Sequence, residues 1–204
     1  LEPSHLSLPD FLEGLVNMVR PQAEVKHVAF NYTHSGRMPA WVQADAKRLR
    51  QIIINLLSNA VRFTDKGSVT LHVDCRSDVI RFDVVDTGIG IAPQDQQRIF
   101  LPFERGAAGR RRGEPGTGLG LTITALLTSL MGGDLSLHST PGQGSTFWVT
   151  AWLGRGQGPR GAGGDPQGDG ARLTLRLSTS LTMMIYRVPC RYPMMSLCLT
   201  IIRK

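Results

Sequence analysis

The sequence has few cysteines, and it lacks a long apolar run. Its three cysteines, Cys75, Cys190 and Cys198, form no CxxC pair, so we expect a reducing compartment, with neither a disulfide framework nor a zinc site. The first ten residues show no basic segment followed by an apolar run, so no signal peptide is visible. No uncharged apolar stretch approaches the roughly 20 residues that span a bilayer. We therefore expect no direct membrane contact from this chain and any membrane attachment to lie outside it.

The positive charge of the chain is concentrated near its end. The 204 residues carry a formal net charge of +7. Residues 1–153 hold 15 Lys and Arg against 14 Asp and Glu, whereas residues 154–204 hold 8 against 2. A basic face on the folded part is therefore not indicated, and we expect no nucleic-acid partner.

Composition also divides the chain near residue 153. Residues 154–170 include 8 glycines, which cannot support a packed element. Residues 171–204 mix apolar residues with Arg and Pro without a clean period, and they fit neither a receiver domain nor a membrane span. We expect one domain over residues 1–153, whose first eight residues connect to a preceding segment. Beyond it we expect a glycine-rich linker and a disordered tail, either a truncated linker or a segment that is not native sequence.

Apolar periodicity predicts helices and strands in one α/β domain. The strongest pattern follows Asp45, a predicted N-cap, and places seven apolar residues from Leu49 to Val61 on one helical face. The predicted helices cover residues 9–19, 45–63, 93–99 and 119–131. The predicted strands cover residues 25–32, 41–42, 69–75, 79–85, 135–138 and 146–153.

The other face of the helix predicted over residues 45–63 is polar. Asn55 and Asn59 lie one helical turn apart, which places two amide oxygens on the same face. Such oxygens suit Mg²⁺, a cation that takes few protein ligands and completes its shell with water and phosphate. Arg62, nearly a turn further on, is placed to pair with a phosphate. The alternative is a solvated helix face that carries these residues by chance.

A glycine-containing turn follows an apolar strand at residues 86–91. Asp86 ends that strand, so its carboxylate lies in a poorly solvated place and needs a specific donor. The exocyclic amine of adenine is one such donor, and Gly88 and Gly90 allow the backbone to approach a flat ring closely. The alternative is a tight turn between a strand and a helix.

A second glycine-rich segment, residues 116–121, opens the helix predicted over residues 119–131. Glycines at a helix N-terminus leave N–H groups and the positive end of the helix dipole open to phosphate oxygens. A dinucleotide-binding unit would require a strand directly before this segment, and none is predicted there. Three consecutive arginines lie just before it at residues 110–112. We take residues 104–116 as a mobile lid, with a solvated run of charge as the alternative.

Five segments together resemble the ATPase domains of histidine kinases. Residues 45–64, which contain RQIIINLLSNAVRFT, resemble the N box of that family. DTGIGI (86–91), IFLPFERG (99–106), GTGLGL (116–121) and GQGSTF (142–147) resemble its first glycine box, its F box, and its second and third glycine boxes. They occur in the order and spacing of the family, and the resemblance covers about residues 1–153.

The resemblance implies a fold and a phosphate-binding region. The fold is an α/β two-layer sandwich, in which helices cover one face of a mixed β-sheet and ATP lies between the helices and a flexible lid. Asn59 would hold Mg²⁺, Asn55 would lie by the γ-phosphate, and Arg62 would complete the catalytic residues.

The resemblance also implies the residues around the base and the lid. Asp86 would accept a hydrogen bond from adenine, with Thr146 nearby. Phe100 and Phe103 would anchor the lid, Phe103 beside the nucleotide. The remaining residues that would contact or shape the nucleotide site are Gly88, Gly90, Ile91, Gly116, Thr117, Gly118, Leu119 and Gly120.

The function that the resemblance implies is the ATP-binding catalytic domain of a two-component sensor histidine kinase. It would transfer the γ-phosphoryl group of ATP to a histidine on a separate dimerisation domain, with a response regulator downstream. It would be a cytoplasmic domain of a sensor anchored in the inner membrane.

Two features depart from the family pattern. Arg62 stands where the family often has Lys, which keeps the charge but changes the geometry offered to phosphate. None of the five histidines has the helical, acid-flanked setting of a phosphoacceptor, so we expect that this chain alone is not a complete autokinase. Two other functions stay open: a non-catalytic module that uses ATP to set partner contacts, and an ATPase of the gyrase or chaperone type.

Overall fold

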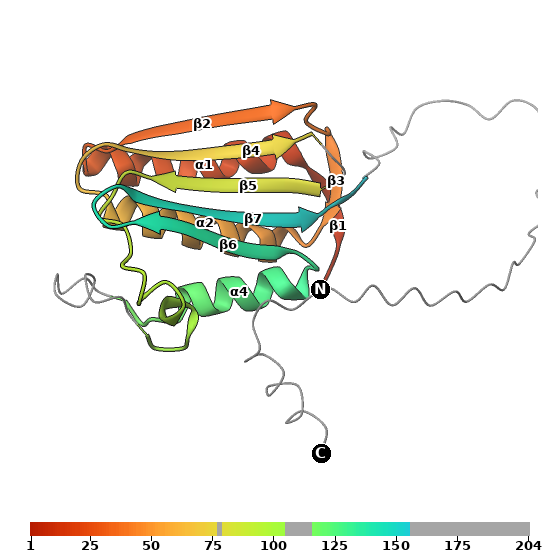
Figure 1. Ribbon diagram of the computed structural model, residues 1–204. Coiled ribbons are helices and arrows are strands. Elements are labelled where there is room, and N and C mark those ends of the chain that lie inside the picture. Colours follow the sequence, from red (N-terminus) through yellow and green to blue (C-terminus); the bar gives the residue numbers. More distant parts are fainter. Residues whose placement is uncertain (77–78, 105–115, 156–204) are drawn as a thin grey trace, which may run out of the picture. The chain divides into compact units, whose positions relative to one another are not determined.

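The computed structural model describes residues 1–76, 79–104 and 116–155 (Figure 1). Residues 77–78, 105–115 and 156–204 lie outside this description, and with them most of the predicted lid and nearly all of the predicted tail. The described elements belong to one compact unit, Leu1–Gly161.

A five-stranded sheet forms one layer of this unit, with the strand order β2-β4-β5-β7-β6. β2 and β4 pair in parallel and the other neighbours are antiparallel, so the sheet is mixed. β4 and β5, which correspond to the strands predicted over residues 69–75 and 79–85, form a hairpin with Val69 opposite Asp86. The strands are β2 (Ala29–Gly36), β4 (Ser68–Cys75), β5 (Val79–Asp86), β6 (Asp134–Thr140) and β7 (Gly144–Trp152).

The helices α1 (Leu8–Val25) and α2 (Ala46–Phe63) lie on one face of this sheet (Figure 1). The helix α4 (Gly120–Leu130) packs against α2 and β6. The central strands β4 and β5 alternate between buried and half-buried residues, because the helices that the structure describes cover only one face. α2 buries all seven residues of its predicted apolar face. Asp45 caps it by accepting a hydrogen bond from the Arg48 amide at 3.1 Å. The predicted α/β sandwich is confirmed.

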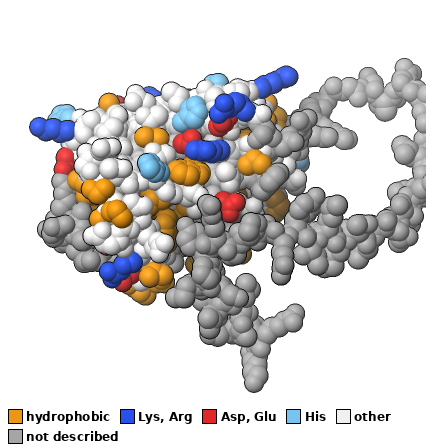
Figure 2. Space-filling model, viewed as in Figure 1, with side chains coloured by type: hydrophobic (Ala, Val, Ile, Leu, Met, Phe, Trp, Pro, Cys, Tyr) orange, Lys and Arg blue, Asp and Glu red, His pale blue; other side chains and the backbone are white. Residues whose placement is uncertain are grey.

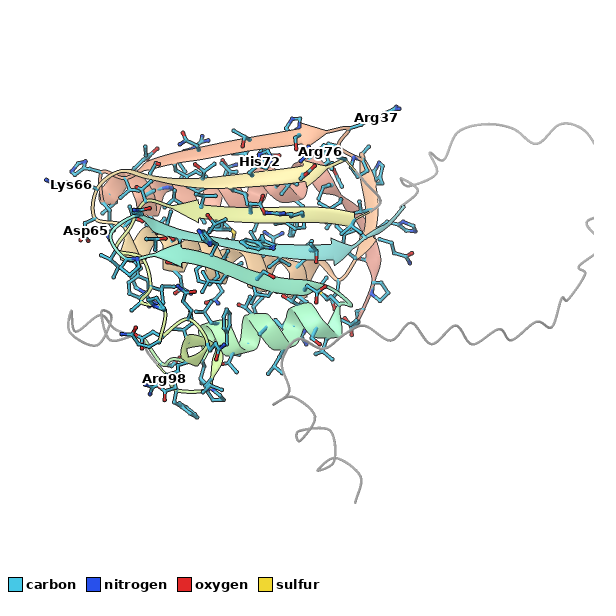
Figure 3. All side chains as sticks on the ribbon, in the orientation of Figure 1. Arg37, Asp65, Lys66, His72, Arg76 and Arg98 are labelled. Atoms are coloured by element: carbon cyan, nitrogen blue, oxygen red, sulfur yellow. The ribbon has the colours of Figure 1, made fainter. Side chains whose placement is uncertain are left out.

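The uncovered face of the sheet carries polar and aromatic side chains. Oppositely charged residues and histidines are interspersed on it (Figure 2). Arg81 lies over the Trp148 ring, 5.0 Å from its centroid. His72, which Figure 3 labels on this face, is within hydrogen-bond distance of the Thr33 and Ser35 hydroxyls at 2.8 and 3.2 Å. These contacts link the neighbouring strands β2 and β4.

A small second sheet has the order β1-β3-β8 and was only partly predicted. It contains β1 (Ser4–Ser7), β3 (Trp41–Ala44) and β8 (Gly154–Arg155). β1 and β8 are too short and too poor in apolar residues to show a period of two. Gly154, which the sequence analysis placed at the start of the linker, pairs with Gln43 instead.

Two other predicted elements differ from the structure. The helix predicted over residues 9–19 continues through Pro21 to Val25, because Val19 and Ala23 remain buried against the core. The strand predicted from residue 25 therefore begins only at Ala29. The helix predicted over residues 93–99 is a series of turns, followed by the short 3₁₀ helix η1 (Arg98–Phe100). Within the described ranges, none of the helices is both long enough and apolar enough to span a bilayer.

Candidate active site

The polar stripe predicted on α2 is present and half-buried. Asn55 donates from its Nδ2 to the Thr124 hydroxyl on α4 at 2.7 Å. Asn59 accepts from Arg62 Nη2 through its Oδ1 at 2.6 Å. The guanidinium of Arg62 also lies 4.7 Å from the centroid of the Phe63 ring. The last turns of α2 therefore present two amides and one cation, with the cation bonded to Asn59 and Asn55 bonded to α4.

The second glycine segment lies directly against this stripe. A Cβ atom at Gly120 would stand 2.5 Å from Asn55 Oδ1, and one at Gly116 would stand 3.2 Å from Arg62 Nη1. Only glycine lets the start of α4 approach α2 this closely without displacing Asn55. Gly118 has a φ of +72° and accepts a hydrogen bond from the Phe103 amide at 3.1 Å. The segment thus joins the α2 stripe to the F box.

Thr117 and Leu119 complete this segment. Thr117 is exposed, and its hydroxyl accepts a weak hydrogen bond from the Leu119 amide at 3.4 Å. Leu119 occupies the N-cap position of α4 and has no side-chain capping bond. Backbone N–H groups at such a helix start are suited to phosphate oxygens.

Asp86 lies at the end of β5 and is only 6% exposed. Its Oδ1 accepts from the backbone amides of Gly88 at 2.9 Å and Ser145 at 3.2 Å. Burial raises the pKa of the Asp86 carboxyl, and hydrogen bonds from Gly88 and Ser145 oppose that shift. Both backbone bonds go to the same oxygen, so one edge of the carboxylate is fixed by the fold.

The turn after Asp86 is tied to two distant parts of the chain. The Ile89 amide donates to the Phe63 carbonyl at the end of α2 at 3.3 Å, and the Ile89 carbonyl accepts from Gly142 at 2.8 Å. The Ile91 amide donates to the Ser139 hydroxyl at 2.8 Å. Gly90 has a φ of +66°, and a Cβ there would stand 2.1 Å from the Thr140 carbonyl oxygen. The first and third glycine segments and the end of α2 are therefore brought together.

Ser145 is a site residue that the sequence analysis missed. Thr146 was expected near Asp86, but it pairs with Val85, so it lies on the opposite face of the sheet. Ser145 pairs with Asp86, is 7% exposed, and forms a side-chain hydrogen bond with the carboxylate. Counting the strand register back from the buried Phe147 would have selected Ser145, because side chains alternate between the faces.

The F-box phenylalanines differ in environment. Phe100 packs partly buried against the core, and its carbonyl accepts from the Thr122 hydroxyl of α4 at 3.0 Å. Phe103 is 74% exposed and has a φ of +63°. Both residues were predicted to anchor the lid. Residues 105–115 of that lid lie outside the described part of the chain, so the role stays a prediction.

The site therefore has two ends. The Asp86 end comprises residues 86–91 and the facing turn at 142–145. The Asn59 end comprises Asn55, Asn59 and Arg62 with residues 116–120. The chemistry of the donors fits a magnesium nucleotide: half-buried amide oxygens and a guanidinium at one end, and a buried acceptor at the other.

Comparison with known proteins finds a family and several relatives for this chain. Residues 44–155 match the family described as histidine kinase-, DNA gyrase B- and HSP90-like ATPase. The sensor histidine kinase RcsC of Salmonella typhimurium is 39% identical over 147 residues, which cover 72% of this chain and 16% of that protein. The signal transduction histidine-protein kinase BarA of Escherichia coli is 39% identical over 153 residues, which cover 72% of this chain and 17% of that protein.

A solved structure shows the same fold. The crystal structure of full-length ShkA in complex with AMPPNP superposes with a TM-score of 0.68 at 33% identity, covering 78% of this chain and 33% of that one. This chain spans about one sixth of the length of RcsC and BarA.

The matched segment defines the class of protein as a nucleotide-binding α/β domain. Because the family match covers more than half of the 204 residues, the chain belongs to the histidine kinase-, DNA gyrase B- and HSP90-like ATPase family. Its similar relatives are sensor histidine kinases, and the family resemblance predicted from the sequence is confirmed.

Proposed function

We propose that this chain is the ATP-binding catalytic domain of a sensor histidine kinase. The observation that carries the proposal is the approach of Gly120 to Asn55, which places the start of α4 against the amide and guanidinium stripe of α2. This arrangement supports phosphate binding by N–H groups and by Arg62. The buried Asp86, at the other end, supports recognition of a base amine.

Each residue has a role in this proposal. Asn59 would offer Oδ1 to Mg²⁺ and Asn55 would orient the γ-phosphate. Arg62 would balance negative charge that develops during transfer. Asp86 would accept from the adenine amine through the oxygen that its backbone donors leave open. Mg²⁺, when bound, would supply further positive charge to the phosphates.

The reaction would be a direct phosphoryl transfer. A ring nitrogen of the acceptor histidine would form a bond to the γ-phosphorus while the bond from that phosphorus to the bridging oxygen breaks, and ADP would leave. The chain would contribute mainly positioning and charge stabilisation. The phosphoryl group would pass next to a response regulator.

The acceptor would be a histidine-bearing dimerisation domain of the same kinase. Support comes from exposed apolar side chains on and beside α4, the helix whose start belongs to the Asn59 end, and a helical partner would dock there. Leu126 of α4 and Leu101, the C-cap residue of η1, are each 49% exposed, and η1 packs on α4. The domain would lie on the cytoplasmic side of a membrane-anchored sensor.

Incubating the chain with Mg-ATP labelled at the γ-phosphate would test this function. Histidine-bearing fragments from several relatives would serve as acceptors, and phosphohistidine and free phosphate would be measured separately. We expect label on histidine. Free phosphate alone would indicate an ATPase of the gyrase or chaperone type. Nucleotide binding without either product would indicate a non-catalytic module.

A further inference from the structure

The C-terminal end of α2 has an unusual set of hydrogen-bond partners. The last four carbonyl groups of a helix have no amide partner within it. In α2 the Ala60 carbonyl accepts from the Thr64 hydroxyl at 2.8 Å, and the Phe63 carbonyl accepts from Ile89. The other two accept from one side chain: Lys26 Nζ lies 3.0 Å from the Val61 oxygen and 2.8 Å from the Arg62 oxygen. All four carbonyls are therefore satisfied.

Lys26 reaches this position from a well-fixed turn. It is the C-cap residue of α1 and lies about 35 residues from its partners in sequence. The next residue, His27, has a left-handed φ of +56°, and its amide donates to the Glu24 carbonyl at 2.9 Å. The Val28 amide closes the turn onto Ala23 at 2.9 Å. The side chain thus crosses from the end of one helix to the end of another.

We infer that Lys26 is a positioning residue for the nucleotide site, an inference that rests on the proposed function. Its ammonium holds the backbone of Arg62, whose guanidinium contacts Asn59 and lies against Gly116. It also places a positive charge at the negative end of the α2 dipole. That end carries the residues that would meet a triphosphate, so an uncompensated dipole there would repel the ligand.

The test compares affinities for Mg-ATP and for adenosine, which has no phosphate. Lys26→Met removes the charge and keeps much of the length, whereas Lys26→Arg keeps a donor and the charge. Lys47→Met, at an exposed position in the first turn of α2, is the matched control. Val28→Ala, at a buried position in the Lys26 turn, controls for lost stability. All affinities are measured below the melting temperature of the least stable variant.

We expect Lys26→Met to weaken Mg-ATP binding roughly two- to thirtyfold, the range for a charge at a helix end. Adenosine affinity should stay within twofold, Lys26→Arg should restore most of the loss, and both controls should match the parent. Equal Mg-ATP affinity in Lys26→Met and the parent would overturn the inference. So would an equal loss for adenosine, or an equal effect of Val28→Ala. A parent that binds no Mg-ATP would instead reject the proposed function.

Discussion

Asp86 and Asn59, the two side chains after which the ends of the candidate site are named, differ in what holds them. At the Asp86 end, backbone amides fix both the carboxylate and the turn that follows it, through Gly88, Ser145, Ile89 and Gly142. At the Asn59 end the polar groups bond to one another, as Arg62 does to Asn59 at 2.6 Å. Backbone bonds are part of the fold, whereas side-chain pairs exchange partners readily.

This difference matches what each end is proposed to bind. A planar base presents the same hydrogen-bonding edge throughout a reaction, so a preformed acceptor serves it. The phosphates and their cation change charge and position during transfer, so groups that exchange partners serve them. The predictions below test this division, beginning with the largest expected effect.

Asn59→Ala should have the largest effect on catalysis. It removes the proposed cation ligand and leaves Arg62 Nη2 without its 2.6 Å acceptor. We expect phosphoryl transfer to fall by on the order of a hundredfold or more, with little change in melting temperature because Asn59 lies off the apolar face of α2. Initial rates of phosphohistidine formation would measure this.

Asn17→Ala, an exposed substitution on α1, is the control for the same chemical change outside the site. It should leave the transfer rate unchanged. Equal rates for Asn59→Ala and the parent would show that the Asn59 end does not bind the cation.

Asp86→Asn should affect affinity strongly and stability little. The amide oxygen can still accept from Gly88 and Ser145, but its –NH₂ group would face the donating amine of adenine. We expect Mg-ATP affinity to fall about tenfold or more, measured by isothermal titration. If the parent and the variant bind ATP and GTP alike, Asp86 has only a structural role.

Ser145 and Thr146 offer a sharper test of the Asp86 end. Ser145 shares a face with Asp86, whereas Thr146 pairs with Val85 on the other face. We expect Ser145→Ala to weaken Mg-ATP binding roughly two- to tenfold, about the effect of losing one hydrogen bond that positions Asp86. Thr146→Val should stay within twofold. The reverse order would favour the expectation drawn from the family motif over the strand register.

Most of the fold could be predicted from the sequence. Long periodic segments such as α2 and the β4–β5 hairpin were predicted because each buries one face against a single partner layer. β1 and β8 were not, since two to four residues at a sheet edge leave no readable pattern. The end of α1 was misplaced because burial of Ala23 outweighs the hydrogen bond that Pro21 cannot form.

For the site, the sequence identified the chemical groups and not their partners. The spacing of Asn55 and Asn59 placed both on one helical face, because local geometry determines that. The contact of Asn55 with Gly120, and the bonds of Lys26 to α2, depend on tertiary packing between distant segments. No local pattern in the chain carries that information.

The free energy of unfolding should depend on pH partly through the titration of Asp86. Burial raises the pKa of its carboxyl, so between the ordinary value of about 4 and the raised value the folded chain binds more protons than the unfolded one. The parent should therefore lose stability as pH rises through that window. Asp86→Asn cannot titrate, so we expect it to gain stability relative to the parent over the same window. Denaturant unfolding at several pH values would check this, and a constant difference would contradict it.

Deleting residues 156–204 should have the smallest effect. We propose that the domain ends close to residue 153, and β8, the last described element, ends at Arg155. The glycine-rich composition after it does not favour a packed element, and neither end of the site uses residues beyond 145. We expect Mg-ATP affinity and melting temperature to match those of the full chain within error. A deletion that instead begins at Gly154 removes the pairing with Gln43 and should lower the melting temperature slightly. A clear loss from the first deletion would show that the segment packs on the domain and that the proposed boundary is wrong.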